Sequence, residues 1–523
     1  MKKCITSIEK RIENAFINNR AEIIFSLLAG VITYLLLMTG DLVNDVDGLW
    51  HPSNFIAGDW EISLGRGLQR YADRARFGIV SAVLNSVLTL SLISVSNVCI
   101  VNVLGIKDKL YRYAALLLMV ANPIVCNSLT YSYMSVNFGL AWFFAVCAVL
   151  PHAQKETSGK SKHILAVLGS GLLLGIAMAF YQAYICVTAI VLLFLFIKNI
   201  LEEQKLKKIG CYACKVLLSV LAGGCFYLII TKLLLWRADV EMSGYKGASN
   251  VGVGSIISNL PNSVAESYKQ YWNYIKNGKM FSALEFMDVL IIGLLVVYLI
   301  AVLFRFVKLL KAHKVHALLY LIAVLLIPVA SCAVILIAVG NSMTVLMSMG
   351  MLMSIVLLGS IIEDKSFWIK RIHCFLIIAL AWFQLSAVIN DQLALREGKD
   401  ATITLTENVV SELITQGYLE DVAQPVAFVG QPGSSPMFMQ SVAYQTANGY
   451  ARFGCWSTDS RNNRYSWLGV TSNFLGISMN ICDEYTYEEI RISKEIADMP
   501  VFPGEGSVRI IDGVVVVKVS ELY

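Results

Sequence analysis

The sequence predicts an α-helical polytopic membrane protein with about eleven transmembrane helices and a small α/β domain at its C-terminal end. Of its 523 residues, 57% are hydrophobic and only 15% are charged, and the mean hydropathy is +0.64. Soluble domains carry about 25% charged residues, so this chain lacks the polar side chains needed to cover a soluble globule. The net charge of +5 is small and does not indicate nucleic-acid binding.

Apolar runs, each of roughly the length that crosses a ~30 Å hydrocarbon core, recur along the first three quarters of the chain. The first run follows five Lys and Arg residues but is longer than the core of a signal peptide, so we interpret it as an uncleaved anchor. The predicted spans are residues 22–41, 77–104, 114–130, 134–150, 164–180, 184–197, 216–236, 286–304, 317–339, 343–362 and 373–391.

The distribution of Lys and Arg tests this count, because an error of one span would exchange the sides of every later loop. With a cytoplasmic N-terminus, the cytoplasmic segments hold 23 Lys and Arg in 83 residues, whereas the opposite loops hold 9 in 93. The bias is consistent along the chain. It predicts a multi-pass membrane protein whose C-terminal domain lies outside the cytoplasm.

Two domains are predicted: a transmembrane domain over residues 1–391, with large outer loops at 42–76 and 237–285, and an extracytoplasmic α/β domain over 392–523. The tail carries 9 Lys and Arg against 16 Asp and Glu. Its patterns predict helices over 402–414 and 488–497, a strand over 425–430 and a hairpin turn before 514–518. The sequence leaves open whether Cys455 and Cys482 form a disulfide. The loop 237–285 is predicted to contain an amphipathic interfacial helix.

The first outer loop contains crowded carboxylates directly after a helix exit. Asp45 and Asp47 are two residues apart, and their crowding at a low-dielectric border makes at least one carboxylate a stronger base. The pair can act as a general base, bind a sugar hydroxyl or bind a divalent cation such as Mg²⁺ or Mn²⁺. The alternative is that these acids mark an outer loop and cap the next helix.

The same loop contains arginines on the side where the positive-inside rule expects few. Arg66, Arg70 and Arg74 recur at i, i+4 and i+8, which on one helix is a stripe about 12 Å long. Such a row is suited to a phosphate group. The alternative is an interfacial helix whose arginines pair with its own acids, such as Asp73.

Five further residues are candidates for substrate binding. Trp60 offers an aromatic plane beside the carboxylate of Glu61, although Trp is also common as an interfacial anchor. Tyr181 and Gln182 place a phenol and an amide at the outer surface, where Tyr is also a usual component of the aromatic belt. Lys232, near the outer end of the seventh span, is suited to an anionic head group or extends its ammonium group to the interface.

Several function classes are excluded or disfavoured. The sequence contains no Gly-rich phosphate loop of a nucleotide-driven motor. Charges deep inside the spans are nearly missing, which argues against an ion-coupled transporter. A flippase or exporter of a lipid-linked saccharide is the main alternative to an enzyme, and a scaffold with an acidic outer domain is a third.

The chain resembles the bacterial type II membrane glucosyltransferases that modify O-antigen and other surface glycans, members of the GT-C class. The resemblance is carried by six short segments whose order and side of the membrane agree: Asn44 to Asp47, Trp60 to Arg66, Asn122-Pro123 with Tyr131, Tyr181-Gln182, Met499 to Ser507, and Val514 to Lys518.

The resemblance implies transfer of a hexose, with glucose favoured, from a polyprenyl-phosphate donor to a surface polysaccharide or teichoic-acid-like acceptor at the outer face of a bacterial membrane. The role of base falls on Asp45 or Asp47, with Asp47 slightly favoured, and Arg66 would contact the donor phosphate. Many donors of this kind need no metal, because the leaving group has a single phosphate. The family's usual Gly-Arg-Trp or Gly-Arg-Pro is Gly65-Arg66-Gly67 here, so different packing is expected beside Arg66.

Overall fold

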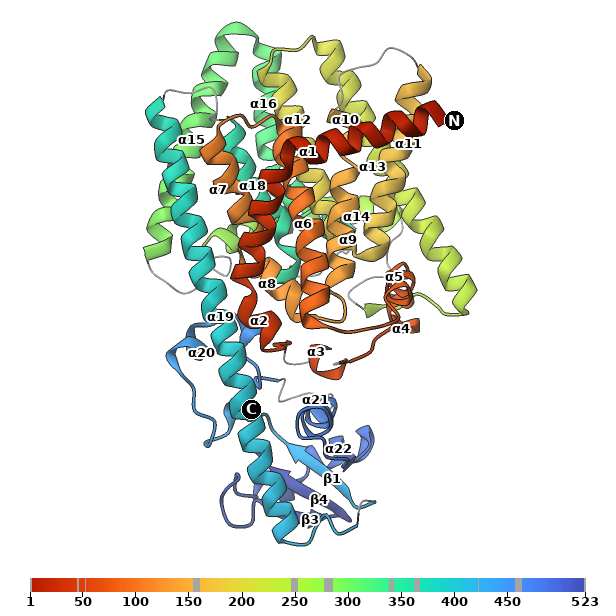
Figure 1. Cartoon of the computed structure of the whole chain (residues 1–523), viewed down its shortest axis with the longest axis vertical. Coiled ribbons are helices and arrows are strands. Elements are labelled where there is room, and N and C mark those ends of the chain that lie inside the picture. Colours follow the sequence, from red (N-terminus) through yellow and green to blue (C-terminus); the bar gives the residue numbers. More distant parts are fainter. Residues whose placement is uncertain are drawn as a thin grey trace.

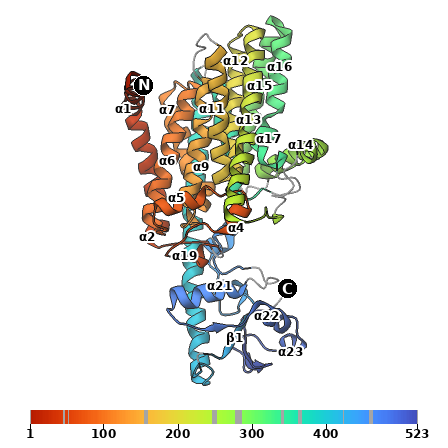
Figure 2. The ribbon, with the colours of Figure 1, turned by 90° about the vertical axis from the view of Figure 1, so that its right-hand side faces the viewer.

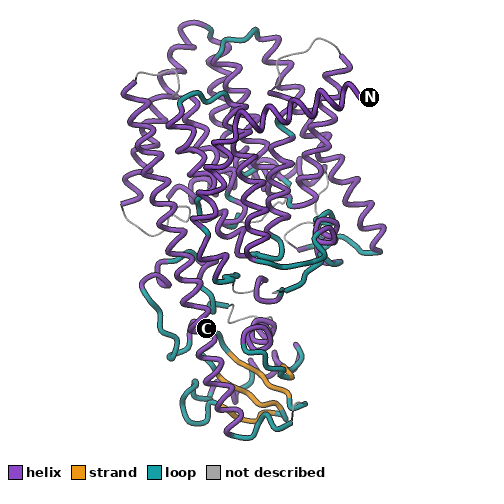
Figure 3. Tube along the Cα trace, viewed as in Figure 1, coloured by secondary structure: helices purple, strands orange, loops and turns teal. Residues whose placement is uncertain are grey.

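A computed structural model describes most of the chain, and it shows a helical bundle with a small mixed sheet at one end (Figure 1). The strands found in the described residues all lie in that terminal part (Figure 3). The described residues are 2–44, 47–51, 53–153, 160–245, 253–276, 286–337, 343–361, 367–421, 423–456 and 463–521.

The helices that precede the C-terminal sheet range from single turns to one helix of 49 residues. They are α1 (Lys2–Thr33), α2 (Leu35–Thr39), α3 (Asp47–Trp50), α4 (Asp59–Ser63), α5 (Gln69–Ala75), α6 (Ala82–Leu104), α7 (Lys109–Val120), α8 (Pro123–Thr130), α9 (Ser135–Cys147), α10 (Leu150–Ala153), α11 (Lys160–Phe180), α12 (Ile185–Leu201), α13 (Leu206–Ala238), α14 (Val253–Lys276), α15 (Phe286–Ala312), α16 (Lys314–Leu325), α17 (Ile327–Ser331), α18 (Met349–Leu358) and α19 (Phe367–Thr415).

The prediction of a multi-pass helical membrane protein is confirmed. Within the described residues, nine helical segments are long and apolar enough to cross a membrane, and each overlaps one of the eleven predicted spans. The other two predictions correspond to α1 with α2, which are separated at Tyr34, and to the shorter apolar segment Met349–Ile361. In the loop predicted over 237–285, α14 forms the expected long helix, which projects sideways from the bundle in Figure 2.

The break between α1 and α2 is stabilised by one side chain of α19. Gln392 accepts a hydrogen bond from the Leu37 backbone N–H at 2.9 Å and donates from Nε2 to the Thr33 carbonyl at 2.8 Å. A helix break leaves backbone groups without their intrahelical partners, and these are costly when buried. Gln392 is itself buried, so its amide replaces the partners that the helix loses.

We predict that Gln392→Leu destabilises the protein by about 2–5 kcal/mol, because two buried backbone groups lose their partners at about 1–3 kcal/mol each. Thermal or denaturant unfolding of the purified protein in detergent measures this loss. Gln416→Leu, at an exposed position just past α19, is the matched control and should change stability by no more than about 0.5 kcal/mol. Equal stability of the two variants would contradict the role given to Gln392.

α11 and α13 pack closely at the end of the bundle where α4 and α5 lie. A Cβ atom at Gly171 would lie 2.6 Å from the Ala222 Cβ, and one at Gly175 would lie 2.8 Å from the Phe226 Cβ. Small residues at such contacts let two membrane helices approach closely. The consequence is that Tyr227, one residue beyond Phe226, lies beside the segment that follows α11.

The C-terminal part contains a four-stranded sheet in the order β2-β1-β4-β3. β1 is parallel to β2 and to β4, whereas β3 is antiparallel to β4. Its elements are β1 (Pro425–Val429), α20 (Val442–Thr446), α21 (Asn463–Gly469), β2 (Asn480–Ile481), α22 (Glu484–Arg491), α23 (Lys494–Ala497), β3 (Val508–Ile511) and β4 (Val514–Lys518). The predicted strand at 425–430 and the hairpin before residue 514 are confirmed.

Two details of the tail differ from the predictions. The single helix predicted over 488–497 is wrong, because the Ser493 hydroxyl accepts a hydrogen bond from the Ile496 N–H and begins a new helix, α23. The last predicted span and the predicted helix 402–414 form one continuous helix, α19, which passes through residue 391 without a break. The division into two domains at that residue stays a prediction.

Candidate functional site

The candidate site lies at the end of the bundle that faces the C-terminal sheet, where α3, α4 and α5 are found (Figure 1). The side-chain oxygen of Asn44 accepts a hydrogen bond from the Gly48 N–H, which places Asp47 in the first turn of α3. Asp47 is half-buried. Asp45, the other candidate base and the second half of the possible metal pair, lies outside the described residues.

Arg66 lies in the turn between α4 and α5, and it contacts the segment that follows α11. Its guanidinium carbon is 4.7 Å from the centre of the Tyr181 ring, and its Nε donates to Gln182 Oε1 at 3.3 Å. Gln182 in turn donates to the Leu64 carbonyl at 2.6 Å and to the Tyr227 hydroxyl at 3.0 Å. Three residues predicted as substrate contacts, Arg66, Tyr181 and Gln182, are therefore in direct contact with one another.

The predicted stripe of three arginines on one helix is wrong. Residue 66 is outside both helices, because Gly65 with φ of +74° ends the turn that follows α4. Arg70 donates to the Ala57 carbonyl at 2.8 Å and to Asp59 at 2.7 Å, and Arg74 is exposed. Only Arg66 reaches Tyr181 and Gln182.

Gly65 shapes the turn in two ways. Its positive φ is a conformation that residues with a Cβ adopt at a cost of roughly 1–2 kcal/mol, and a Cβ at this position would collide with the Tyr227 hydroxyl. Gly67 is also closely packed, since a Cβ there would lie 2.7 Å from Leu234 Cδ1. The expected difference in packing beside Arg66 is thus a contact with α13.

We predict that Gly65→Ala lowers the turnover number, kcat, on the order of 100-fold, because a displacement of about 1 Å in a positioning group has that effect. The Cβ displaces Tyr227 and with it the Gln182 amide that orients Arg66. Gly210→Ala on α13 is the control, since nothing lies within 4 Å of a Cβ at that position. Unchanged turnover of Gly65→Ala would show that the geometry of this turn is unimportant for activity.

Tyr133 lies in the short connection between α8 and α9 at the same end of the bundle. Burial raises the pKa of its phenol well above the usual value, Asp47, Tyr131 and Glu61 raise it further, and Arg66 lowers it. The raised pKa keeps this phenol protonated, so that its hydroxyl group is a hydrogen-bond donor.

The other predicted residues have different surroundings. Trp60 is 55% exposed, and its ring centre lies 5.6 Å from that of Tyr245. Glu61 Oε2 accepts a hydrogen bond from the Gly58 N–H at 2.6 Å and so caps its own helix, α4. Lys232 is exposed on α13. The contacts described above for Arg66, Tyr181 and Gln182 do not include Lys232.

Sequence reasoning missed two residues of this group. Tyr133 lies in a connection that the span count does predict, so its place at the outer end was a usable signal. Tyr227 lies inside the predicted span 216–236, where an aromatic residue is ordinary, and only the packing of α11 against α13 brings it to Gln182. No sequence pattern indicates that contact.

The C-terminal part packs directly on the helix that carries Asp47. Asn473 donates to the Leu49 carbonyl at 2.9 Å, and a Cβ at Gly469 would lie 2.7 Å from Leu49 Cγ. The Trp50 and Tyr465 rings are 5.3 Å apart. The tail therefore supports α3 and is in contact with the candidate site.

The sequence left open a metal site at Asp45 and Asp47 and a disulfide between Cys455 and Cys482. Among the described residues, no group of three or more His, Cys, Asp or Glu side chains is placed to hold a metal ion; Asp45 is outside that set, so the metal pair stays a hypothesis. The thiols of Cys455 and Cys482 are both free, so the two residues do not form a disulfide.

The fold and the site define a multi-pass membrane protein with a site of carboxylate, guanidinium, phenol and amide groups at one end of its helices. The family model described as glucosyl transferase GtrII matches residues 52–358, more than half of the chain. The protein belongs to this family of glucosyltransferases and is thus a glycosyltransferase. The match includes Arg66, Tyr181 and Gln182. No curated protein and no solved structure matches the chain.

Proposed function

We propose that the protein transfers a hexose, with glucose favoured by the family, from a polyprenyl-phosphate donor to a surface polysaccharide or teichoic-acid-like acceptor at the outer face of a bacterial membrane. The observation that carries this proposal is that Tyr181 and Gln182 hold the guanidinium of Arg66 at the end of the bundle where Asp47 begins α3. Displacement of a phosphate by a hydroxyl group requires a base and a cation, and this end of the bundle carries both.

In the proposed reaction, Asp47 accepts the proton of the acceptor hydroxyl as its oxygen attacks the anomeric carbon of the donor sugar. The bond from that carbon to the phosphate oxygen breaks, and the phosphate leaves with the electron pair. Arg66 stabilises the charge that develops on this oxygen. A single displacement of this kind inverts the anomeric centre.

The surrounding residues orient these groups. Gln182 and Tyr181 hold the guanidinium of Arg66 by a hydrogen bond and by its position over an aromatic ring. Trp60 with Tyr245 offers an exposed aromatic surface of the kind that sugars stack on. Arg70, Lys232 and the metal pair are not required in this scheme, since Arg70 is paired with Asp59 and the leaving group has one phosphate.

The side of the membrane follows from the charge distribution of the loops. The segments that form the site belong to the group with 9 Lys and Arg in 93 residues, which the positive-inside rule assigns to the outer face. Labelling of single introduced cysteines in intact cells with an impermeant reagent tests this orientation. Labelling at exposed Arg74 replaced by Cys, with none at Lys207 replaced by Cys, is expected.

Reconstitution tests the choice of donor. Purified protein in vesicles, supplied with polyprenyl-phosphate glucose and an acceptor polysaccharide, should release polyprenyl phosphate only when the acceptor is present. Nucleotide-activated glucose in place of the lipid donor should give no transfer. Transfer from the nucleotide sugar would contradict the proposed donor, and movement of the intact lipid-linked sugar across the membrane without transfer would favour the flippase.

A further inference from the structure

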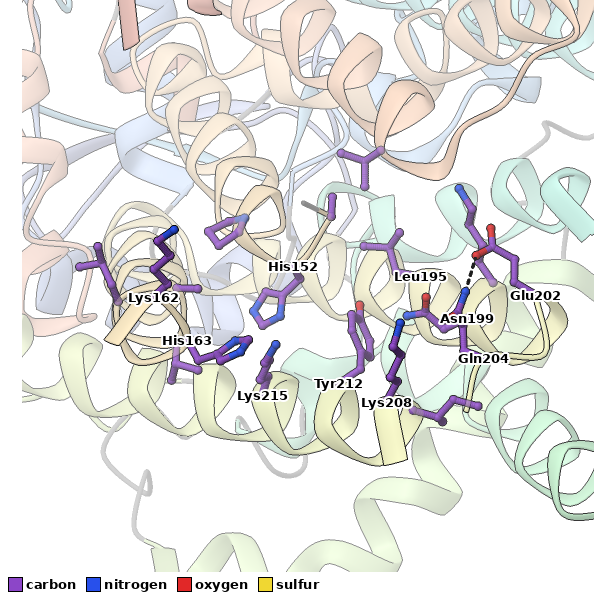
Figure 4. Close-up of a pocket in the computed structure, with 18 residues that line it drawn as sticks. His152, Lys162, His163, Leu195, Asn199, Glu202, Gln204, Lys208, Tyr212 and Lys215 are labelled. Carbon is purple, nitrogen blue, oxygen red and sulfur yellow. Dashed lines mark hydrogen bonds between the residues drawn. The ribbon is translucent and has the colours of Figure 1, made fainter. Parts of the chain in front are cut away.

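A partly open cavity with polar side chains lies at the opposite end of the bundle from the candidate site. Its volume is about 980 Å³, and it is lined by α10, the start of α11, the end of α12 and the start of α13 (Figure 4). α11 extends from this cavity at Lys160 to Phe180, next to Tyr181 of the candidate site, so the two sites are separated by the length of a membrane-spanning helix. The residues of the candidate site do not line this cavity.

The cavity has a strongly basic lining. Of the described residues, four lysines line it, Lys162, Lys198, Lys208 and Lys215, together with one carboxylate, that of Glu202. The carboxylate of Glu202 accepts a hydrogen bond from Gln204 Nε2 at 3.4 Å (Figure 4). Among the described residues, the lining therefore carries more positive than negative side chains, and such a charge attracts an anion.

Not all of these lysines have the same role. Lys198 donates to the Leu104 carbonyl at 3.0 Å and so also fixes the end of α6. Lys208 and Lys215 are seven residues apart on α13, with Tyr212 between them, so the three side chains share one face of the helix. Lys162 approaches from α11. Ammonium groups from two helices therefore surround the same space.

An apolar groove begins where the basic cavity ends. The groove has a volume of about 610 Å³, is lined almost entirely by aliphatic and aromatic side chains of α11, α12, α13 and α17, and shares Tyr212 with the basic cavity. A small soluble anion has no apolar part that could fill this groove. A molecule with a phosphate head group and a hydrocarbon chain fits both parts.

We infer that this cavity binds the phosphate head group of an anionic phospholipid of the leaflet opposite the candidate site, with one acyl chain in the groove that begins at Tyr212. Lys162, Lys208 and Lys215 contact the phosphate. Basic pockets between membrane helices on the Lys-rich side of a protein recognise such head groups. The inference does not depend on the proposed donor or acceptor, because the head-group cavity is lined by none of the candidate-site residues and no transfer is required, although the apolar groove reaches Tyr227.

Native mass spectrometry of the full chain in neutral detergent, titrated with phosphatidylglycerol, tests the inference. The wild type should retain the lipid, and Lys208→Gln/Lys215→Gln should weaken its binding on the order of 10-fold or more. The matched control is Lys205→Gln/Lys207→Gln, which removes the same charge from the start of the same helix at positions that do not line the cavity. The control should bind as the wild type does.

Further variants and competing ligands identify the ligand and separate a loss of binding from misfolding. Lys208→Arg/Lys215→Arg keeps the charge and should bind, and Lys162→Gln, from the other helix, should weaken binding if the double variant fails to fold. Equal loss in the control pair would overturn the inference, because it would show a diffuse attraction to the basic surface. Displacement of the lipid by millimolar inorganic phosphate, or tighter binding of polyprenyl phosphate at this cavity, would also overturn it.

Discussion

Asp47→Asn is expected to lower the turnover number for glucosyl transfer by about 10²–10⁴-fold, the usual contribution of a positioned general base. The amide keeps the size of the side chain but cannot accept the proton of the acceptor hydroxyl. Donor binding should change little, because the donor phosphate is assigned to Arg66. Release of polyprenyl phosphate from the donor, measured at saturating acceptor, gives the turnover number.

Two variants make the Asp47 result specific. Asp59→Asn is the matched control: it also removes a carboxylate of the first outer loop, but Asp59 is exposed and paired with Arg70, so turnover should stay near that of the wild type. Asp45→Asn separates the two candidate bases. Full turnover in Asp47→Asn together with loss in Asp45→Asn would move the role to Asp45, and full turnover in both would refute the assignment.

Arg66→Gln should reduce turnover by about 10²–10³-fold, the effect of removing one group that stabilises developing negative charge. Arg66→Lys should recover only part of the loss, because an ammonium group cannot make the two parallel hydrogen bonds of a guanidinium to phosphate. The same assay of released polyprenyl phosphate measures both variants. Their dissociation constants for the donor should rise as well.

The control for Arg66 comes from the same loop. Arg74→Gln removes an equal charge at an exposed position and should leave turnover unchanged. Because Arg66 also lies over Tyr181 and bonds to Gln182, unfolding of each variant should be measured in parallel. If Arg66→Gln lost activity only in proportion to a loss of folded protein, Arg66 would be a structural residue.

Much of the fold was accessible from the sequence because the membrane imposes a simple rule. A span needs about 20 apolar residues, and nine of the eleven predicted runs coincide with candidate membrane helices of the described chain. The run at 22–41 shows where the rule is insufficient. The hydropathy of the sequence does not predict the helix break at Tyr34. The backbone groups freed by this break bond to Gln392, which is more than 350 positions away in the sequence.

The candidate site was accessible only in part. The acids and arginines of the sequence directed attention to the first loop, and the structure brings Arg66 of that loop into contact with Tyr181 and Gln182; the functional role of these residues stays a prediction. The arginine stripe was wrong because a helical periodicity was applied across Gly65, whose positive φ interrupts the helix. A pattern of spacing carries no information on such a turn unless the backbone conformation is known.

By itself the sequence determined the class of protein, its helical spans and the loop in which to look for chemistry, because these depend on composition and on charge counted along the chain. Only the tertiary structure decided which groups meet. The contact of Arg66 with Gln182, the approach of Tyr227 through the glycines of α11, and the support of Asp47 by Asn473 all join distant segments. Such contacts depend on helix packing in three dimensions, which hydropathy and local spacing do not encode.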